Sequence, residues 1–255
     1  MKQNVKSENR RALPLFLVIV GCSLVLGVLF GMAAVKSDGA DWKAVLTAAL
    51  TWFFAHCSSW LLLALTVSML VVGLVSLSRA RKQIAALEQT EDGDATPADH
   101  TLSFGINYIS LAQIVGYFLF AAVLCSIPEI GIVSCLVGLV SFVALMVVML
   151  VMTQRLVDLA KRLYPEKRGS VYDVKFQKKW MDSCDEAEKA VIAQAAFSAY
   201  SATNTVCLLL WLAFVLGHML FDTGLLPIFA VSLIWFVSFA AYCSKAARLE
   251  KSGIR

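Results

Sequence analysis

Two rows of polar side chains inside otherwise apolar segments are the part of this sequence best suited to bind a ligand. In segments 102–126 and 196–220 the polar residues recur every three or four positions, so each row follows one face of a helix. The first row is Ser103, Asn107, Ser110, Gln113 and Tyr117, and the second is Gln194, Ser198, Ser201 and Thr205, with Asn204 alongside. If the rows face each other, they line a polar cleft for a neutral or amphipathic ligand. The candidate ligand-binding residues are Asn107, Ser110, Gln113, Ser198, Ser201 and Asn204. The more ordinary role of such side chains is hydrogen bonding between helices, at about 0.6–2 kcal/mol per bond.

A metal site is a second chemistry that the residue types allow. His218 and Asp222 are four residues apart and share a helix face, and His56 would complete a set of two histidines and a carboxylate. No HxH or HExxH spacing supports this set, so histidines with ordinary hydrogen-bond partners are favoured. The seven cysteines show no CxxC spacing and are expected to be free thiols, although a disulfide between Cys125 and Cys135 is sterically conceivable. We predict no metal and no cofactor.

A third set of residues suits recognition of a partner. Tyr172, Phe176 and Trp180 recur every four residues with Lys179 beside them, which predicts a helix with one aromatic face. These four are the candidate partner-binding residues. The helix has three candidate roles: lying on the inner leaflet with its lysines at anionic headgroups, docking a cytoplasmic protein, or binding a phosphate-bearing ligand.

Ionisable residues are missing from the apolar segments, where catalysis or ion coupling would need them. The six segments contain no Asp, Glu, Lys or Arg. Charged side chains within spanning helices usually mark proton relays, ion pathways or substrate sites. Their absence argues against proton pumps, carboxylate-dependent carriers and intramembrane proteases, and we predict that the protein is not an enzyme.

The elements that carry these residues are membrane-spanning helices. The chain has 255 residues, of which 59% are apolar and 16% charged, and a span needs about 20 apolar residues. The predicted spans are 12–35, 57–78, 102–126, 131–153, 196–220 and 225–244. The first is too long for a secretory signal and is read as an uncleaved helix. The predicted fold is an all-α polytopic membrane bundle of six transmembrane helices.

Basic residues are distributed unevenly about these spans. Of the 22 Lys and Arg residues, 20 lie in the two termini and the connections 79–101 and 154–195, which all fall on one side of the membrane. The positive-inside rule places that side, with both termini, in the cytoplasm. This distribution explains the net charge of +4 without a nucleic-acid partner.

The spans are expected to form three helical hairpins that end in basic, cytoplasmic helical extensions. The first hairpin differs, because residues 44–78 are uncharged over 35 positions. We expect an interfacial or re-entrant segment at 41–55 before the span, with one steeply tilted helix as the alternative. Segment 154–195 is the sole sizeable cytoplasmic part, and Ser183 with Glu186 fits a capping box there. Gly27 and Gly31 form a GxxxG pair, which favours packing within the bundle over homodimerisation.

A resemblance covers most of the chain and is carried by the segment 164–189. Its motifs are Tyr164–Gly169 (YPEKRG), Lys175–Trp180 (KFQKKW) and Ser183–Lys189 (SCDEAEK). They resemble the signature segment of a bacterial membrane-protein family that is catalogued as a domain of unknown function. The resemblance implies a Gram-positive-type cytoplasmic membrane, and it transfers no activity.

These observations predict a non-enzymatic, partner-binding or regulatory membrane protein. Its inner face would dock a cytoplasmic regulator or ATPase. The alternative is the membrane subunit of an ATP-driven exporter or importer, with a polar cleft between the third and fifth spans.

Overall fold

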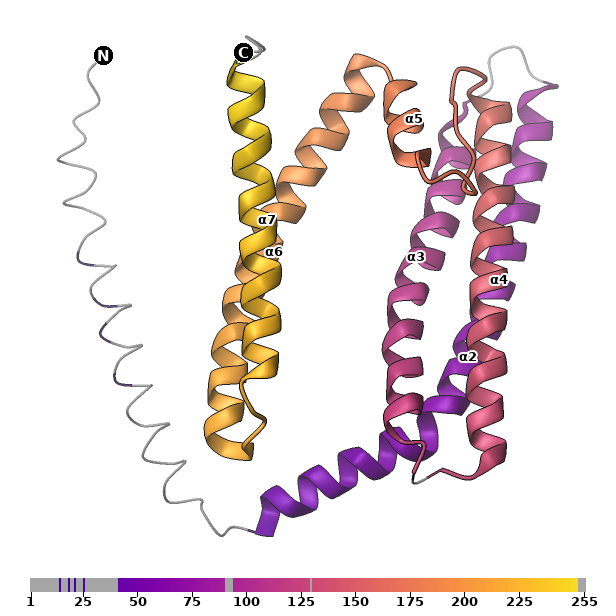
Figure 1. The fold of residues 1–255 in the computed structure, drawn as a ribbon. Coiled ribbons are helices and arrows are strands. Elements are labelled where there is room, and N and C mark those ends of the chain that lie inside the picture. The colour runs from indigo at the N-terminus through magenta and orange to yellow at the C-terminus, as the bar shows by residue number, and fades with distance from the viewer. Residues whose placement is uncertain are drawn as a thin grey trace. The chain divides into compact units, whose positions relative to one another are not determined.

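The computed structural model describes residues 41–89, 94–128 and 130–251, together with four isolated helical positions at 14, 18, 21 and 25. These residues form helices and no strand (Figure 1). The helices are α2 (Asp41–Leu87), α3 (Thr96–Cys125), α4 (Ile132–Leu163), α5 (Phe176–Asp182), α6 (Glu186–Phe221) and α7 (Leu226–Lys251). All except α5 are long and apolar enough to cross a membrane, so the protein is a multi-pass membrane protein by length and composition.

Five of the predicted spans each lie within one of these helices, exceeding its end by one residue at most. The helices are longer than the spans, because α2, α4 and α7 continue through the predicted basic extensions to Leu87, Leu163 and Lys251. The predicted span 12–35 and its Gly27–Gly31 pair lie outside the described residues. The arrangement as three hairpins therefore remains a prediction.

Helix α2 differs from the two separate segments that the sequence predicts. It is one helix of 47 residues, which at 1.5 Å per residue is about 70 Å long, more than twice the hydrocarbon thickness of a bilayer. Figure 1 shows a bend between its first portion and the longer portion beside α3 and α4. Residues 44–53 are all exposed, and packing begins at Ala55. The predicted segment 41–55 and the span after it are therefore parts of one bent helix, and an interfacial or re-entrant position of 41–55 remains a prediction.

The described chain divides into two units, which we treat separately: a central unit (45–191) and a terminal unit (1–44 and 192–255). In the central unit α2, α3 and α4 share one apolar core. Its most buried side chains come from all three helices and recur at helical spacing. They include Leu62 and Met69 of α2, Leu102 and Ile109 of α3, and Leu145 and Leu156 of α4.

Small residues bring the helices of the central unit close together. A Cβ atom on Gly105 of α3 would lie 2.9 Å from Cβ of Ser76 on α2 and 3.0 Å from Cδ1 of Leu156 on α4. Hydroxyl groups add bonds between helices: Thr66 donates to the Ser141 carbonyl at 3.2 Å. Close backbone approach combined with hydroxyl bonds is the usual means of helix association in lipid.

In the terminal unit α6 packs against α7. The rings of Tyr200 and Tyr242 stack with centroids 4.9 Å apart. The indole of Trp235 donates to the side-chain oxygen of Asn204 at 3.1 Å. The turn between the helices contains Gly224 at a φ of 77°, where a side chain would be strained. Its amide donates to Nδ1 of His218 at 3.2 Å, which closes the turn.

Candidate functional site

The connection 164–185 between α4 and α6 is the largest non-spanning part of the described chain, and it is closely tied to the helices around it. The hydroxyl of Tyr164, the residue that ends α4, donates to Oδ2 of Asp99 on α3 at 2.7 Å. This hydrogen bond to Asp99, together with burial, raises the pKa of Tyr164 to about 12. The start of the connection is therefore held to the first turns of α3.

A glutamine of α4 holds the middle of the connection. The side-chain oxygen of Gln154 accepts bonds from the Ser170 hydroxyl at 3.0 Å and from the Val171 amide at 2.8 Å. Gly169, just before them, has a φ of 120°, and a Cβ there would come within 2.9 Å of the Phe176 ring. The chain consequently folds back against α4 at a position that favours glycine.

A buried lysine joins the connection to the start of α6. Lys167 is 6% exposed. Its ammonium group donates to the Glu188 carboxylate and to Sγ of Cys184 at 3.4 Å, and it lies 6.0 Å from the centre of the Trp180 ring. Burial, the largest influence, lowers the pKa of Lys167, but the bonds to Glu188 and Cys184 outweigh it and leave that pKa above its usual value. A buried charge is tolerated in this way when it is paired.

The predicted capping box is wrong by two residues. The amide of Glu188 donates to Oδ1 of Asp185 at 2.7 Å, and the amide of Asp185 donates to Oε2 of Glu188 at 3.0 Å. Asp185 and Glu188 are therefore the reciprocal pair, in place of Ser183 and Glu186. The Ser183 hydroxyl accepts from the Arg168 amide at 3.1 Å and donates to the Trp180 carbonyl at 2.7 Å.

The predicted aromatic helix is shorter than expected. Helix α5 begins at Phe176, so Tyr172 lies in the preceding turn and does not share its face. Phe176 and Trp180 are neighbours with ring centroids 5.7 Å apart, and Trp180 packs against the core of the central unit. Tyr172 is 65% exposed, and Lys179 forms an ion pair with Asp173. The four candidate partner-binding residues thus separate into an inward aromatic pair and two outward side chains.

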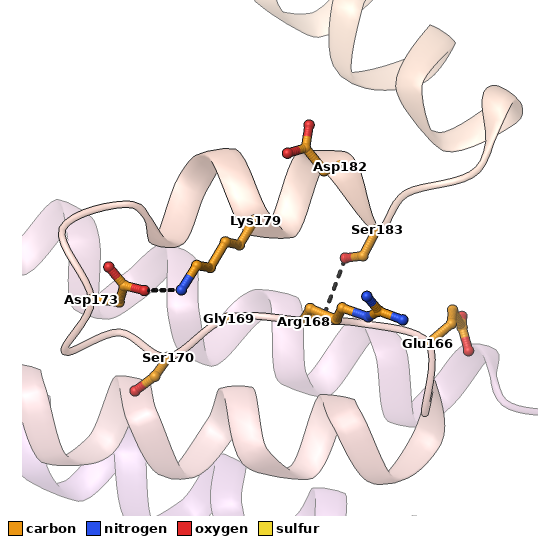
Figure 2. Close-up of a pocket in the computed structure, with 8 residues that line it drawn as sticks. All are labelled: Glu166, Arg168, Gly169, Ser170, Asp173, Lys179, Asp182 and Ser183. Atoms are coloured by element: carbon orange, nitrogen blue, oxygen red, sulfur yellow. Dashed lines mark hydrogen bonds and ion pairs between the residues drawn. The ribbon is translucent and has the colours of Figure 1, made fainter.

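A cavity of about 820 Å³ opens over this connection (Figure 2). Its lining carries both charges, and Figure 2 shows Lys179 and Asp173 pointing toward each other. The lining residues are Glu166, Arg168, Gly169, Ser170, Asp173, Lys179, Asp182 and Ser183. The lining combines carboxylates with lysine and arginine side chains, so it is suited to charge-complementary recognition.

The candidate metal residues belong to different units: His56 to the central unit, and His218 and Asp222 to the terminal unit. Nδ1 of His56, in the central unit, lies 2.9 Å from the Trp52 carbonyl, whereas Nδ1 of His218 accepts the Gly224 amide in the terminal unit. Among the described residues, no three His, Cys, Asp or Glu side chains are grouped as metal ligands. Both described histidines of this set therefore have the ordinary partners that the sequence favoured. Cys125 and Cys135 are free thiols.

Both polar rows lie largely on faces turned away from the core of their own unit. On α3, Ser103, Asn107 and Ser110 are exposed and lie opposite the buried face of Leu102, Gly105, Ile109 and Ala112. Gln113 is half-buried at the edge of that row and donates to the Tyr117 hydroxyl.

On α6, Ser198 and Ser201 are exposed. Asn204 instead points toward α7, where it accepts the Trp235 bond and so acts as the predicted link between helices. A ligand cleft formed by the two rows remains a prediction.

Sequence reasoning missed the residues that hold the connection in place, chiefly Lys167 and Gln154. Nothing local distinguishes Lys167 from the exposed Arg168 beside it. The motifs at 164–189 contain Lys167, Cys184 and Glu188, but nothing in their spacing assigns these residues a role. No protein-family model matches this chain, and no curated protein or solved structure is significantly similar to it.

Proposed function

We propose that this chain is a non-enzymatic protein of a bacterial cytoplasmic membrane, with both termini inside, that docks a cytoplasmic protein through the connection 164–185. The proposed contact surface, the docking ridge, consists of Tyr172, Val174, Lys175 and Lys178. A regulator and an ATPase are the two classes of partner that the sequence suggests. The distribution of the 20 basic residues supports the orientation.

The observation that carries this proposal is the exposure of apolar side chains on a well-held turn. Val174 is fully exposed and Tyr172 is 65% exposed. The turn that presents them is held at both ends: the Asp173 amide donates to the Ser170 carbonyl at 2.9 Å, and the Lys175 amide donates to Oδ1 of Asp173 at 2.9 Å. A preorganised turn loses little entropy on binding, which favours association.

The charges of the ridge indicate the chemistry of the partner. Lys175 and Lys178 are exposed, and neither forms a salt bridge within the described residues. Apolar anchors surrounded by lysines fit an apolar recess with an acidic rim, because complementary charge steers association and fixes its register. We therefore expect a partner with an acidic surface, and binding that weakens as salt concentration rises.

The test is capture of the tagged full-length protein from its native membrane in mild detergent, with quantitative mass spectrometry. Val174→Asp and Lys178→Glu are expected to remove a stoichiometric partner. Gln177→Ala, an exposed substitution on α5 outside the ridge, should retain it. Trp180→Ala is unsuitable as a docking test, because Trp180 packs against the core.

Retention of every co-purifying protein by Val174→Asp and Lys178→Glu would contradict the docking role. A lipid-inserted ridge would contradict it as well. That outcome would appear as quenching of a Tyr172→Trp variant by brominated lipids, with the other tryptophans as the reference.

A transport subunit is the second candidate, and the polar face of α3 favours it. Asn107 is exposed on that face and would be unfavourable against lipid alone. In the transport hypothesis this face borders a water-filled path, so Asn107→Cys should react with a polar thiol reagent. Val115→Cys, an exposed apolar position on the same helix but off the polar row, is the matched control. Equal protection of both positions would count against transport.

A further inference from the structure

A small cavity between α2 and α4 carries an unusual concentration of positive charge. It has a volume of about 210 Å³ and is lined by Arg81 of α2 and by Arg155, Asp158, Leu159 and Arg162 of α4. Asp158, Leu159 and Arg162 lie three, four and seven residues after Arg155, so the four residues of α4 share one helix face. Leu159 is buried and forms an apolar wall. The cavity belongs entirely to the central unit and contains none of the docking ridge.

The arginines of this cavity are not neutralised by carboxylates. Within the described residues, no arginine takes part in a salt bridge. The single carboxylate of the lining, Asp158, is already engaged, since its Oδ1 accepts from Gln154 at 2.7 Å and lies 3.8 Å from Nζ of Lys161. Three guanidinium groups against one carboxylate leave two net positive charges around the cavity. All three arginines are exposed, so water screens part of their mutual repulsion, and an anion bound between them would remove the remainder.

The position of the arginines relative to the predicted spans indicates the source of the anion. Arg81 is three residues beyond the span 57–78, and Arg155 is two residues beyond 131–153. At 1.5 Å per residue these are about 3–5 Å, within the headgroup layer of roughly 5–8 Å on each side of the hydrocarbon. Arg162 is nine residues beyond, or about 13 Å, and lies outside that layer.

We propose that this cavity is a binding site for a phosphate group, supplied by the headgroup of an anionic phospholipid or by a free phosphate. Guanidinium groups bind phosphate oxygens through paired, charge-assisted hydrogen bonds. Basic pockets between spanning helices are a known setting for anionic headgroups. The two sources predict different residue dependence. A lipid phosphate requires Arg81 and Arg155, whereas a free phosphate requires all three arginines.

The chain offers a matched control for general surface charge. Arg79 is on the same helix only two residues before Arg81, but it lines a different cavity, with His100 and Phe104. Arg79→Gln and Arg81→Gln therefore remove the same charge at nearly the same depth. Asp158→Asn is a second informative variant, because it removes the one negative charge of the lining and should strengthen anion binding.

The experiment is a binding titration of the full-length protein in neutral detergent micelles, followed by native mass spectrometry. The probes are phosphatidylglycerol and, as the zwitterionic reference, phosphatidylcholine, with inorganic phosphate titrated separately by calorimetry. For the lipid source we expect phosphatidylglycerol to be preferred and its affinity to fall about tenfold in Arg81→Gln and in Arg155→Gln, the loss of roughly one charged hydrogen bond. Arg79→Gln should match the unsubstituted protein, and Asp158→Asn should bind more tightly.

Each other result has a defined meaning. Phosphate binding that needs Arg81, Arg155 and Arg162, without a preference for phosphatidylglycerol, supports the site with a soluble occupant. An equal loss in Arg79→Gln and Arg81→Gln shows general surface attraction and overturns the proposal. The proposal also fails if neither probe depends on any arginine of the lining while helicity by circular dichroism is unchanged.

Discussion

At the scale of the residue, Lys167 shows how a charged side chain can have a structural role that its surroundings in the sequence conceal. It lies in a basic connection, where lysines are expected to be solvated, but Glu188, Cys184 and Trp180 enclose its ammonium group. Glu188 also caps α6, so one carboxylate holds both the connection and the first turn of that helix. The start of the connection is thus held to α6 by a contact between residues 21 positions apart.

Tyr164 allows a direct pH test of the same connection. Its hydrogen bond to Asp99 raises its pKa to about 12, so the stabilising effect is fully present below the ordinary tyrosine pKa near 10 and is lost as the pH rises through 12. We expect the difference in phenolate absorbance between the native protein and Tyr164→Phe to titrate near pH 12. In an Asp99→Asn background that difference should titrate at lower pH. A difference titration near pH 10 in the native protein would contradict the hydrogen bond.

At the scale of the element, the start of α6 shows why the spacing of a capping box in the sequence does not by itself identify the N-cap residue. Ser183 with Glu186 and Asp185 with Glu188 both have the spacing of a capping box. The tertiary contacts decide between them, because the Ser183 hydroxyl is occupied by Arg168 and Trp180, and Glu188 is oriented by Lys167. For α5 the aromatic spacing predicted a helix from Tyr172, but the turn around Asp173 delays its start to Phe176.

The close packing at Gly105 of α3 leads us to expect that a larger residue there lowers the stability of the protein. A Cβ there would meet Cβ of Ser76 at 2.9 Å, so Gly105→Ala forces two helices apart at a cost of about 1–3 kcal/mol. Alanine also gains about 1 kcal/mol of helix propensity over glycine, which offsets part of that cost. Gly217→Ala on α6 is the control, because it makes the same exchange with no atom within 4 Å. Thermal unfolding in detergent should show a lower midpoint for Gly105→Ala only, and equal midpoints would refute this packing.

At the scale of the whole molecule, the exposed side chains of each unit indicate what surrounds it. The apolar residues exposed on α3, α4, α6 and α7, such as Leu111, Val140, Leu209 and Phe236, are those that a bilayer would cover. Asn107 and Ser201 stand apart because they are exposed and polar within apolar helices. These two faces are therefore where we expect contact with water, a ligand or another helix.

Orientation in the membrane can be measured with introduced cysteines. The positive-inside rule places the turn between α6 and α7 outside and the docking ridge inside. In intact cells a membrane-impermeant maleimide should label Thr223→Cys but not Lys178→Cys, and both should react after the cells are opened. Labelling of the unsubstituted protein gives the background from its native thiols. The reverse pattern would invert the topology and place the docking ridge outside the cell.

The sequence by itself determined the helical class and, within the described residues, five candidate spans. It could do so because a helix needs about 20 consecutive apolar residues to cross a bilayer. It also identified the two polar rows, because helical spacing is local. Only the tertiary structure decided that α2 is one bent helix, that Trp180 faces the core and that Lys167 is buried. It also brought Arg81 to the arginines of α4. Each of these depends on side chains distant in the chain, and no local pattern specifies how such side chains meet.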